Sequence, residues 1–300
     1  MIAFWGAAHM RDQAQGLRDL ISGRMSETAE RSARILTVTS GKGGVGKSNF
    51  TLNFALFLRR SGYRVLVFDA DIGLANLDVL MGVTPKYNLY HLLKNEKSLK
   101  EIVHTGPEGL KFIAGGSGFT ELVRLTDAEL EHFASQVVQL GAENDFIIFD
   151  TGAGLSKETL KFILAAEETF VVTTPEPTAI TDAYAIIKMV KNMNHDVRFR
   201  LVVNRVANEK EGRQTADKIS LVARKFLGLD IPTLGFVEDD VHVSRAVRKQ
   251  VPFSIEYPAS AASRSLARIV QSYLQGIGSE QIPKQGSIRG FLHRMRKLLT

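Results

Sequence analysis

The chain has 300 residues, 44% of them hydrophobic, so it can bury the core of one large domain or two small ones. It contains no cysteine, which excludes disulfides, thiolate zinc sites, cysteine-ligated iron–sulfur clusters and cysteine nucleophiles. The formal net charge is +6, and residues 284–300 supply five of these charges. The C-terminal segment is therefore basic and the rest of the chain nearly neutral, which argues against a main domain that binds DNA over its surface.

Membrane-spanning and secretory segments are not expected. No apolar run approaches the roughly 20 residues that a spanning helix needs, and the first residues lack the regions of a signal peptide. We therefore expect a cytoplasmic protein. Met10 is an alternative first residue, because it opens a more coherent segment than residues 1–9 do.

The predicted elements alternate between two kinds along the chain. After an N-terminal appendage, residues 1–32, with a short amphipathic helix at 11–21, we predict one domain from 33 to 277 without internal repeats. Continuous apolar runs, typical of strands buried on both faces, lie at 35–40, 64–69, 110–114, 146–150, 169–174, 199–204 and 233–237. Helical patterns lie at 49–60, 127–140, 157–166, 178–193 and 214–227. The alternation predicts an α/β fold, a doubly wound and mostly parallel sheet with helices on both faces.

A glycine-rich segment joins the first predicted strand to the first helix. It satisfies G-x-x-x-x-G-K-[ST], a phosphate-binding loop, with Gly41, Lys42, Gly43, Gly44, Val45, Gly46, Lys47 and Ser48. The glycines let backbone N–H groups face phosphates, and the helix that follows presents its positive end. Lys47 is expected to neutralise the β- and γ-phosphates, and Ser48 to bind Mg²⁺. The alternative is a glycine turn without a ligand.

Lys42 indicates which class of phosphate-loop protein this is. In K-G-G-x-G-K-[ST], residues 42–48, the loop resembles the deviant Walker A loop of the MinD/ParA family of ATPases. The resemblance implies ATP as the nucleotide, and an ATP-dependent homodimer in which Lys42 reaches the partner's phosphates and acts as an arginine finger does. A solvated loop lysine is the alternative. Asn49 stands where many relatives have threonine, but its backbone amide can still meet the α-phosphate.

Two carboxylates follow the second predicted strand, in Phe-Asp-Ala-Asp-Ile-Gly-Leu-Ala-Asn-Leu-Asp, residues 68–78. Carboxylates at the carboxyl ends of strands lie beside the ligand crevice of an open α/β sheet. The segment resembles switch I of MinD-like ATPases, which implies that Asp71 orients the attacking water and that Asp69 acts on Mg²⁺ through water. The alternative is a pair of carboxylates that cap a helix.

A third apolar strand, residues 146–150, ends in an aspartate, as a Walker B element does. Asp150 is expected to hold Mg²⁺ through water, and the glycines after it to form switch II. MinD itself more often has Ser-Pro-Ala-Gly after this aspartate. The segment 151–154, Thr-Gly-Ala-Gly, is therefore a departure that bears on how switch II transmits the state of the γ-phosphate.

Polar residues after two later strands are candidates for the base. Asn204, followed by Arg205, resembles the family position at which an asparagine reads the adenine edge. Glu238 and Asp239 are expected to close over the other side of the base, and helix capping is their alternative role.

The end of the chain carries an amphipathic pattern. A tether, residues 278–287, is predicted to precede a helix at 288–300 whose apolar face lies in an anionic membrane surface and whose basic residues lie opposite. One such helix binds weakly, and dimerisation doubles it. Its predicted membrane face consists of Ile288, Phe291, Leu292, Met295, Leu298 and Leu299. The alternatives are a helix docked on the protein's own core and a nucleic-acid patch. The docked helix and the membrane helix are compatible as two states of one switch. Direct DNA binding is less expected, because the segment lacks interleaved aromatic residues that could stack on bases.

The N-terminal appendage resembles one group within the family. Asp12, Gln13, Ala14, Leu17 and Arg18 match the D-Q-A-x-x-L-R element of the FlhG group of MinD-like ATPases, which controls flagellar number and position. The resemblance implies stimulation of FlhF, a partner GTPase of the signal-recognition-particle type, and contacts with flagellar switch-ring proteins or a flagellar transcription activator. It also implies a weak, dimer-dependent ATPase at the inner face of the cell membrane when ATP is bound.

Several rivals share this fold. The missing cysteines argue against nitrogenase iron proteins, iron–sulfur carriers and arsenite pump ATPases, and no tyrosine-rich tail of a bacterial tyrosine kinase follows Tyr273. A MinD-type division-site regulator, a ParA-like DNA-partitioning ATPase and an ATP-dependent metabolic ligase stay open.

Overall fold

The computed structural model describes residues 33–71, 76–115, 140–193, 197–279, 290–291 and 294–295. The strands are β1 (Arg34–Ser40), β2 (Val65–Ala70), β3 (His104–Thr105), β4 (Lys111–Ile113), β5 (Phe146–Ala153), β6 (Glu168–Thr173), β7 (Arg198–Val206) and β8 (Thr233–Glu238). The α-helices are α2 (Lys47–Arg60), α3 (Leu77–Met81), α4 (Leu89–Leu93), α5 (Leu99–Ile102), α8 (Lys157–Ala165), α9 (Pro177–Asn192), α10 (Glu209–Leu227), α11 (Val241–Lys249), α12 (Phe253–Glu256) and α13 (Ala261–Ser279), with a 3₁₀ turn at Pro107–Gly109.

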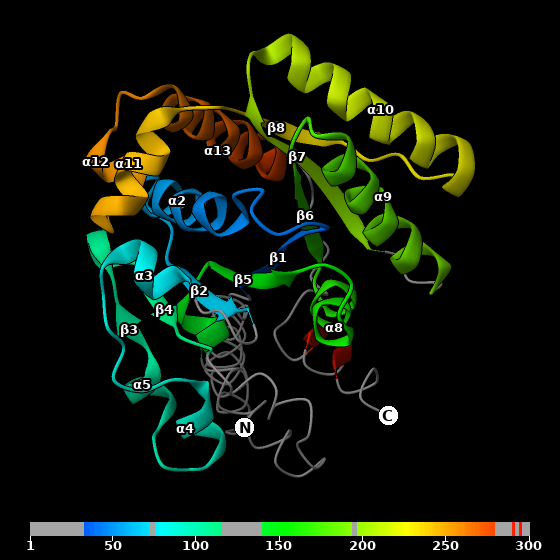
Figure 1. Cartoon of the computed structure of the whole chain (residues 1–300). Coiled ribbons are helices and arrows are strands. Elements are labelled where there is room, and N and C mark those ends of the chain that lie inside the picture. The colour runs from blue at the N-terminus through cyan, green and yellow to red at the C-terminus, as the bar shows by residue number, and fades with distance from the viewer. Residues whose placement is uncertain are drawn as a thin grey trace, which may run out of the picture.

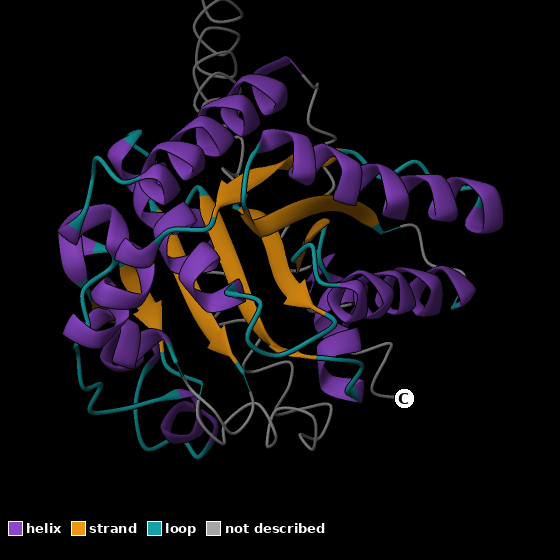
Figure 2. Ribbon diagram, turned by 45° about the horizontal axis from the view of Figure 1, so that its top comes forward, coloured by secondary structure: helices purple, strands orange, loops and turns teal. Residues whose placement is uncertain are grey.

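These strands form one sheet in the order β3-β4-β2-β5-β1-β6-β7-β8. Neighbouring strands are parallel, except that β3 runs antiparallel to β4 at one edge. Every residue of β1, β2 and β6 is buried, because helices cover both faces of the sheet (Figures 1 and 2). The predicted doubly wound, mostly parallel α/β fold is confirmed.

The direction of the connections places the helices. The crossover through α2 leads from β1 toward the β2 side, whereas those through α8, α9 and α10 lead toward β8 (Figure 1). Right-handed crossovers in opposite directions lie on opposite faces of a sheet. Accordingly α2 packs with α13 on one face, and α9 packs with α10 on the other. All these parallel strands point their carboxyl ends at the same edge, where the ligand crevice of such a fold lies.

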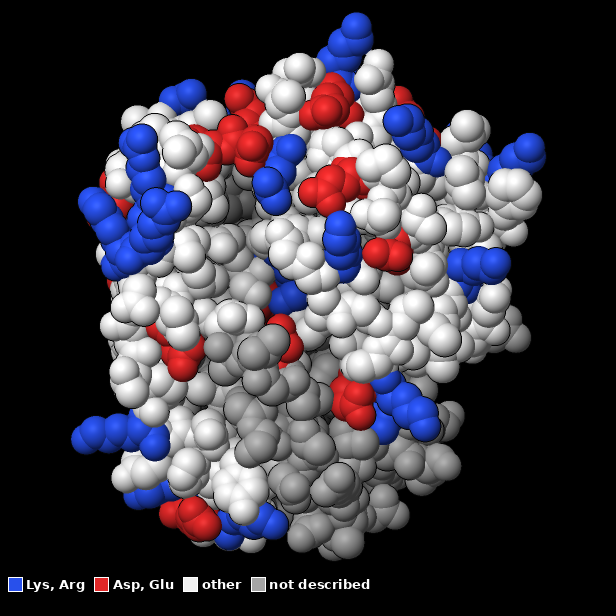
Figure 3. Space-filling model, viewed as in Figure 1, with Lys and Arg blue, Asp and Glu red and all other residues white. Residues whose placement is uncertain are grey.

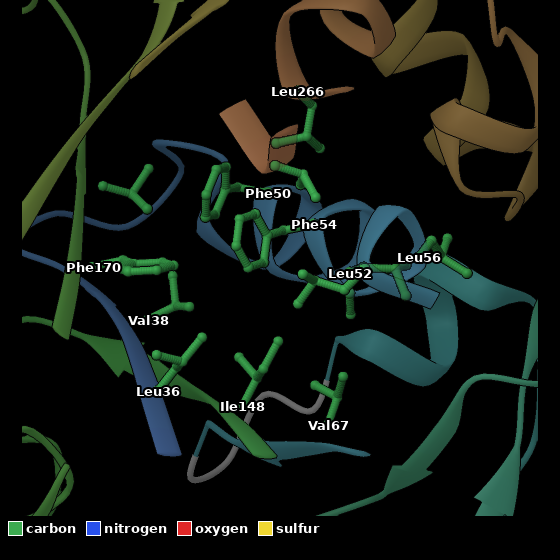
Figure 4. Close-up of a cluster of buried hydrophobic side chains, with 14 of the residues drawn as sticks. Leu36, Val38, Phe50, Leu52, Phe54, Leu56, Val67, Ile148, Phe170 and Leu266 are labelled. Carbon is green, nitrogen blue, oxygen red and sulfur yellow. The ribbon is translucent and has the colours of Figure 1, made fainter. Parts of the chain in front are cut away.

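The helix α2 is held firmly in the core. Phe50 and Phe54 stack on each other at 5.4 Å, and Phe54 meets Phe170 of β6 edge-on at 5.4 Å and Tyr273 of α13 at 5.6 Å. Figure 4 shows both α2 rings between the strands and Leu266 of α13. A helix packed on two sides keeps its N-terminus fixed, and here that N-terminus follows the glycine-rich loop.

Some elements differ from the prediction. The helix α10 begins at Glu209, five residues earlier than expected, because the side chain of Asn208 caps it by accepting a hydrogen bond from the N–H of Glu211 at 3.0 Å. The two-residue β3 and six helices, α3, α4, α5, α11, α12 and α13, were not predicted. The predicted helix at 127–140 lies outside the described residues except for its last residue. The helix α13 extends to Ser279, two residues into the predicted tether.

Within the described part of the chain, none of the helices combines the length and the apolar character that a membrane crossing requires.

Two C-terminal side chains lie in the core. Phe291 is 1% exposed and stacks on Phe149 of β5 with ring centroids 4.7 Å apart, and Met295 is 2% exposed in the same apolar cluster. The guanidinium of Arg294 donates two hydrogen bonds, of 2.9 and 2.7 Å, to the carbonyl oxygen of Ala165 at the end of α8. These contacts are those of the docked-helix alternative. The other predicted membrane residues, Ile288, Leu292, Leu298 and Leu299, and the predicted partner segment, residues 12–18, lie outside the described residues.

Glu167, which lies near Arg294, gives the folded state a pH dependence. Burial raises the pKa of its carboxyl from the usual 4.5 to about 7, although the N–H of Ile35 and the charges of Arg34, Arg294 and Arg198 oppose the rise. The folded carboxyl therefore keeps a proton that the unfolded one loses between pH 4.5 and about 7, so the stability falls as the pH rises through that window. We expect the free energy of unfolding of Glu167→Gln, measured with urea and relative to that of the wild type, to rise by about 2–3 kcal/mol from pH 5 to pH 8. A pH-independent difference would contradict this.

Candidate active site

The predicted phosphate loop lies between β1 and α2, at the carboxyl edge of the sheet. Gly46 has φ 91° and ψ 19°, a left-handed conformation, and among the described residues no side-chain hydrogen bond caps the start of α2. Only glycine fits at position 41, because a Cβ there would lie 2.3 Å from the carbonyl carbon of Asp182. Uncapped N–H groups and the positive end of a helix form a site for an anion.

Two cavities meet at this loop. One, of about 590 Å³, contains the loop, Asp71 and Gly152, and is suited to phosphates. The other, of about 690 Å³, contains Asn204 and the apolar side chains of Phe50 and Phe253, and is suited to a nucleoside. Both cavities include Gly44, Gly46 and Asn49, so a single elongated ligand could pass from one to the other along the loop.

A buried ion pair lies at the floor of the phosphate cavity. Lys47 Nζ lies 3.0 Å from Asp150 Oδ1, and their side chains are 7% and 0% exposed. Lys47 also donates to Ser48 Oγ at 3.2 Å, and Thr51 Oγ1 donates to the same oxygen of Asp150 at 2.8 Å. The sequence analysis missed Thr51, although a hydroxyl one helical turn after Lys47 on a buried face was a usable signal.

The second oxygen of Asp150 fits a metal ligand. Oδ2 is buried and has no hydrogen-bond partner among the described residues. A buried carboxylate oxygen without a partner is costly, so it calls for a water or a cation. Ser48 and Asp150 are therefore suited to hold Mg²⁺ directly or through water, as the sequence predicts.

Asp69 is occupied by backbone donors. It lies opposite Asp150 in the register of β2 and β5, and its Oδ2 accepts from the N–H groups of Asn76 at 2.9 Å and Leu77 at 3.1 Å. Burial and then repulsion by Asp150 raise the pKa of Asp69 to about 7. Asp69 thus caps α3, which was the alternative weighed for this carboxylate, and its action on Mg²⁺ stays a prediction.

Asp71 lines the phosphate cavity between the two predicted switches. A Cβ added at Gly152, in switch II, would lie 3.1 Å from Asp71 Oδ1. Burial raises the pKa of Asp71, the charge of Lys47 lowers it, and that of Asp150 raises it. The carboxylate therefore lies in the phosphate cavity, and its role in orienting water stays a prediction.

Lys42 is paired within its own chain. Its Nζ lies 2.9 Å from Glu176 Oε2 and 3.0 Å from Thr178 Oγ1, at the start of α9. The hydrogen bond from Lys42 lowers the pKa of Glu176. The two side chains are 42% and 54% exposed, and such pairs contribute only about 0.2–1 kcal/mol. Lys42 can therefore exchange this partner for a phosphate at little cost. The sequence analysis did not find Glu176 or Thr178.

The residues predicted for the base all line the nucleoside cavity. Asn204 donates from Nδ2 to the carbonyl oxygen of Val45 at 2.8 Å. Arg205 Nε lies 3.4 Å from Asp239 Oδ1, and Glu238 Oε1 lies 3.6 Å from the guanidinium of Arg268. Their contacts with a base stay predictions.

The residue that caps helices here is Asp240, which follows Asp239 in the chain. Its Oδ1 accepts from the N–H of His242 at 2.9 Å and its Oδ2 from the N–H of Ala262 at 3.1 Å. One carboxylate thus ties the beginnings of α11 and α13 together beside the nucleoside cavity. The sequence analysis weighed capping only for Glu238 and Asp239.

The loop, the buried lysine–aspartate pair and the parallel sheet define a P-loop nucleotide-binding protein. The model of the CobQ/CobB/MinD/ParA nucleotide-binding domain matches residues 36–253, and the chain belongs to this family. The resemblance to MinD/ParA ATPases is confirmed.

Two curated relatives carry flagellar or regulatory names. The chain is 39% identical over 297 residues to the flagellum site-determining protein YlxH of Helicobacter pylori, covering 97% of this chain and 100% of the relative. It is 34% identical over 264 residues to the antiactivator FleN of Pseudomonas aeruginosa, covering 87% and 93%. Both are FlhG homologues, so the similarity to the FlhG group is confirmed. Among solved structures, the septum site-determining protein MinD of Pyrococcus horikoshii, complexed with Mg-ADP, has the same fold, with a TM-score of 0.66, 23% identity and coverage of 83% and 99%.

Proposed function

We propose that this chain is an ATP-hydrolysing switch that dimerises when ATP binds, cycles on and off the inner face of the cell membrane, and regulates the number or placement of flagella. The observation that carries the proposal is an exposed Lys42 at the mouth of a phosphate site, in a chain similar along nearly its whole length to a flagellum site-determining protein. The proposed partners are a second copy, an SRP-type GTPase such as FlhF, and flagellar switch-ring proteins or a flagellar transcription activator.

The site residues have separate roles in hydrolysis. Ser48 and Asp150 would hold Mg²⁺, which would supply positive charge to the phosphates. Lys47 leaves its pair with Asp150 and binds the same phosphates, while Asp71 orients the attacking water. The Lys42 of the partner subunit adds charge where the transferring phosphoryl group develops it.

The C-terminal segment links the nucleotide to the membrane in this proposal. Phe291 and Met295 are 1% and 2% exposed, so neither can contact lipid until the segment leaves the core. Burial of a large apolar side chain is worth about 1.5–3 kcal/mol, and a side chain that moves from the core to another apolar environment retains this free energy. Release into a lipid interface therefore replaces the lost contacts, and two segments on one dimer bind far more strongly than one.

The position of these contacts supports a coupling to the phosphate site. Phe291 stacks on Phe149, which directly precedes Asp150, and Arg294 binds the end of α8. The first turn of α8 is joined to switch II, because Thr159 Oγ1 donates to the carbonyl oxygen of Gly152 at 3.4 Å. We infer that movement of switch II toward a γ-phosphate is passed to the docked segment through α8 and β5.

The proposal is tested by co-sedimentation with vesicles that contain anionic lipid, in ATP and in ADP. We expect the full chain to bind vesicles with ATP at least about tenfold more than with ADP, since two linked sites raise avidity by orders of magnitude. Removal of residues 288–300 should abolish binding in both nucleotides. Equal binding of the full chain in ATP and ADP would contradict the switch.

A second arm of the same experiment separates flagellar from division-site function. Removal of residues 10–21 should leave nucleotide-dependent vesicle binding intact and abolish stimulation of the GTPase activity of FlhF. Retained stimulation would favour a MinD-type regulator instead.

The DNA-partitioning alternative has weaker support. Acidic and basic side chains are interspersed over the face shown in Figure 3, although basic ones gather at its upper left, over α11 and α12. Retention on DNA that falls steeply with salt, without vesicle binding, would favour that alternative.

A further inference from the structure

Asn204 lies where the nucleoside cavity meets the phosphate loop. Its amide nitrogen donates a hydrogen bond of 2.8 Å to the carbonyl oxygen of Val45, a loop residue whose side chain is 4% exposed. The same nitrogen lies against the next residue, because a Cβ added at Gly46 would be 2.3 Å from it. The amide therefore packs directly on the part of the loop from which α2 begins.

The backbone at the end of β7 is shaped for this contact. The register of β7 with β8 shifts between Asn204 and Val206, so Arg205 is an inserted residue, and its φ is +57°. A left-handed conformation in a residue other than glycine is strained and persists only where the surroundings impose it. Bulges of this kind near functional sites re-aim neighbouring side chains. Here the bulge directly follows the side chain that binds the loop.

We propose that Asn204 is a positioning residue for the phosphate loop, and that it braces the peptide between Val45 and Gly46 in the shape that binds phosphates. One N–H of the amide serves this contact. The second N–H and the oxygen remain for the nucleoside cavity, which Asn204 also lines. The residue that faces the base thus also fixes the loop that binds the phosphates.

This role differs measurably from reading the base alone. A residue that only reads adenine affects ligands that carry adenine and leaves inorganic tripolyphosphate unaffected. A brace of the loop affects both ligands alike, because both use the same loop N–H groups. The brace also acts before any ligand binds, since the contact with Val45 belongs to the protein itself.

The test uses the full chain with Asn204→Ala, and Asn208→Ala as the matched control. Asn208 also makes one side chain–backbone hydrogen bond, to the N–H of Glu211, but it lines neither cavity. The control therefore shares any general loss of stability. Affinities for Mg-ATP and for Mg-tripolyphosphate are measured by calorimetry.

We expect Asn204→Ala to weaken tripolyphosphate by a factor of about two to ten, the size of one lost hydrogen bond, and ATP by at least that factor, and Asn208→Ala to change neither. In the nucleotide-free protein, hydrogen exchange of the amides in residues 41–49 should be faster in Asn204→Ala and unchanged in the control. Asn204→Ser, whose hydroxyl is too short to reach Val45, should behave as the alanine variant does and serves if that variant does not fold.

Two results would overturn the proposal. A loss of ATP affinity with unchanged tripolyphosphate affinity would make Asn204 a base reader only. Hydrogen exchange that is unchanged in the loop, or faster throughout the domain, would show that the contact with Val45 does not hold the loop in place.

Discussion

Replacing Lys42 with alanine should lower the rate of ATP hydrolysis by about 10³–10⁵-fold, the effect of removing an arginine finger. The variant should also fail to form a dimer with ATP. Lys42 is not needed inside its own site, where Lys47 already faces the phosphate cavity, and its pair with Glu176 is exposed and weak. Phosphate release and sedimentation velocity with ATP measure the two effects.

Glu176→Gln is the matched control for this prediction. It removes the charge that holds Lys42 in the monomer but keeps Lys42 itself. Because exposed pairs contribute about 0.2–1 kcal/mol, hydrolysis should change by no more than about fivefold. If Glu176→Gln lowered hydrolysis as much as Lys42→Ala, Lys42 would act through its contact with α9. A Lys42→Ala variant that still dimerised would contradict the proposed role.

Asp71→Ala should lower hydrolysis by about 10²–10⁴-fold, the range for a positioned acid–base group, while ATP still binds. Asp71 lines the phosphate cavity beside Gly152, but it makes none of the contacts that hold Lys47 or the loop. The variant should therefore accumulate as ATP-bound dimers on vesicles. Single-turnover hydrolysis and vesicle co-sedimentation measure this outcome.

Asp78→Ala provides the comparison for Asp71. Asp78 lies in the first turn of α3 and accepts from the N–H of Val79 at 2.7 Å, outside the phosphate cavity. Its loss should leave hydrolysis within about twofold, since exposed substitutions rarely exceed ±0.5 kcal/mol. Monomeric Asp71→Ala in ATP, or equal losses in the two variants, would argue against a role of Asp71 in orienting water.

The phosphate site was predictable because its parts are local. The loop with Lys47 follows one continuous apolar run, and Asp150 ends another. Such runs mark buried strands, and parallel strands bring their carboxyl ends to one edge. The contact of Lys42 with Glu176 joins residues 134 positions apart, and no local pattern encodes it. It exists only because β6 pairs with β1 and carries the start of α9 to the loop.

Other misses had different physical causes. Three consecutive acids, residues 238–240, make capping ambiguous from the sequence, and only the backbone conformation assigns it to Asp240. The strand β3 has two residues, too few for a pattern. The helix α13 did leave a signal, since Leu266, Ile269, Val270 and Tyr273 repeat every three or four residues and are all buried, but their small polar neighbours weakened it.

The pair of Lys47 and Asp150 has a consequence for the order in which ligands can be accepted. Each charge is the other's counterion, and the two side chains are only 7% and 0% exposed. A nucleotide arriving without a cation would draw the ammonium away and leave the carboxylate buried and uncompensated, a loss of about 3–5 kcal/mol for a broken internal pair. A cation arriving alone would displace the ammonium of Lys47 and leave it without a counterion. The pair therefore favours the binding of nucleotide and divalent cation together.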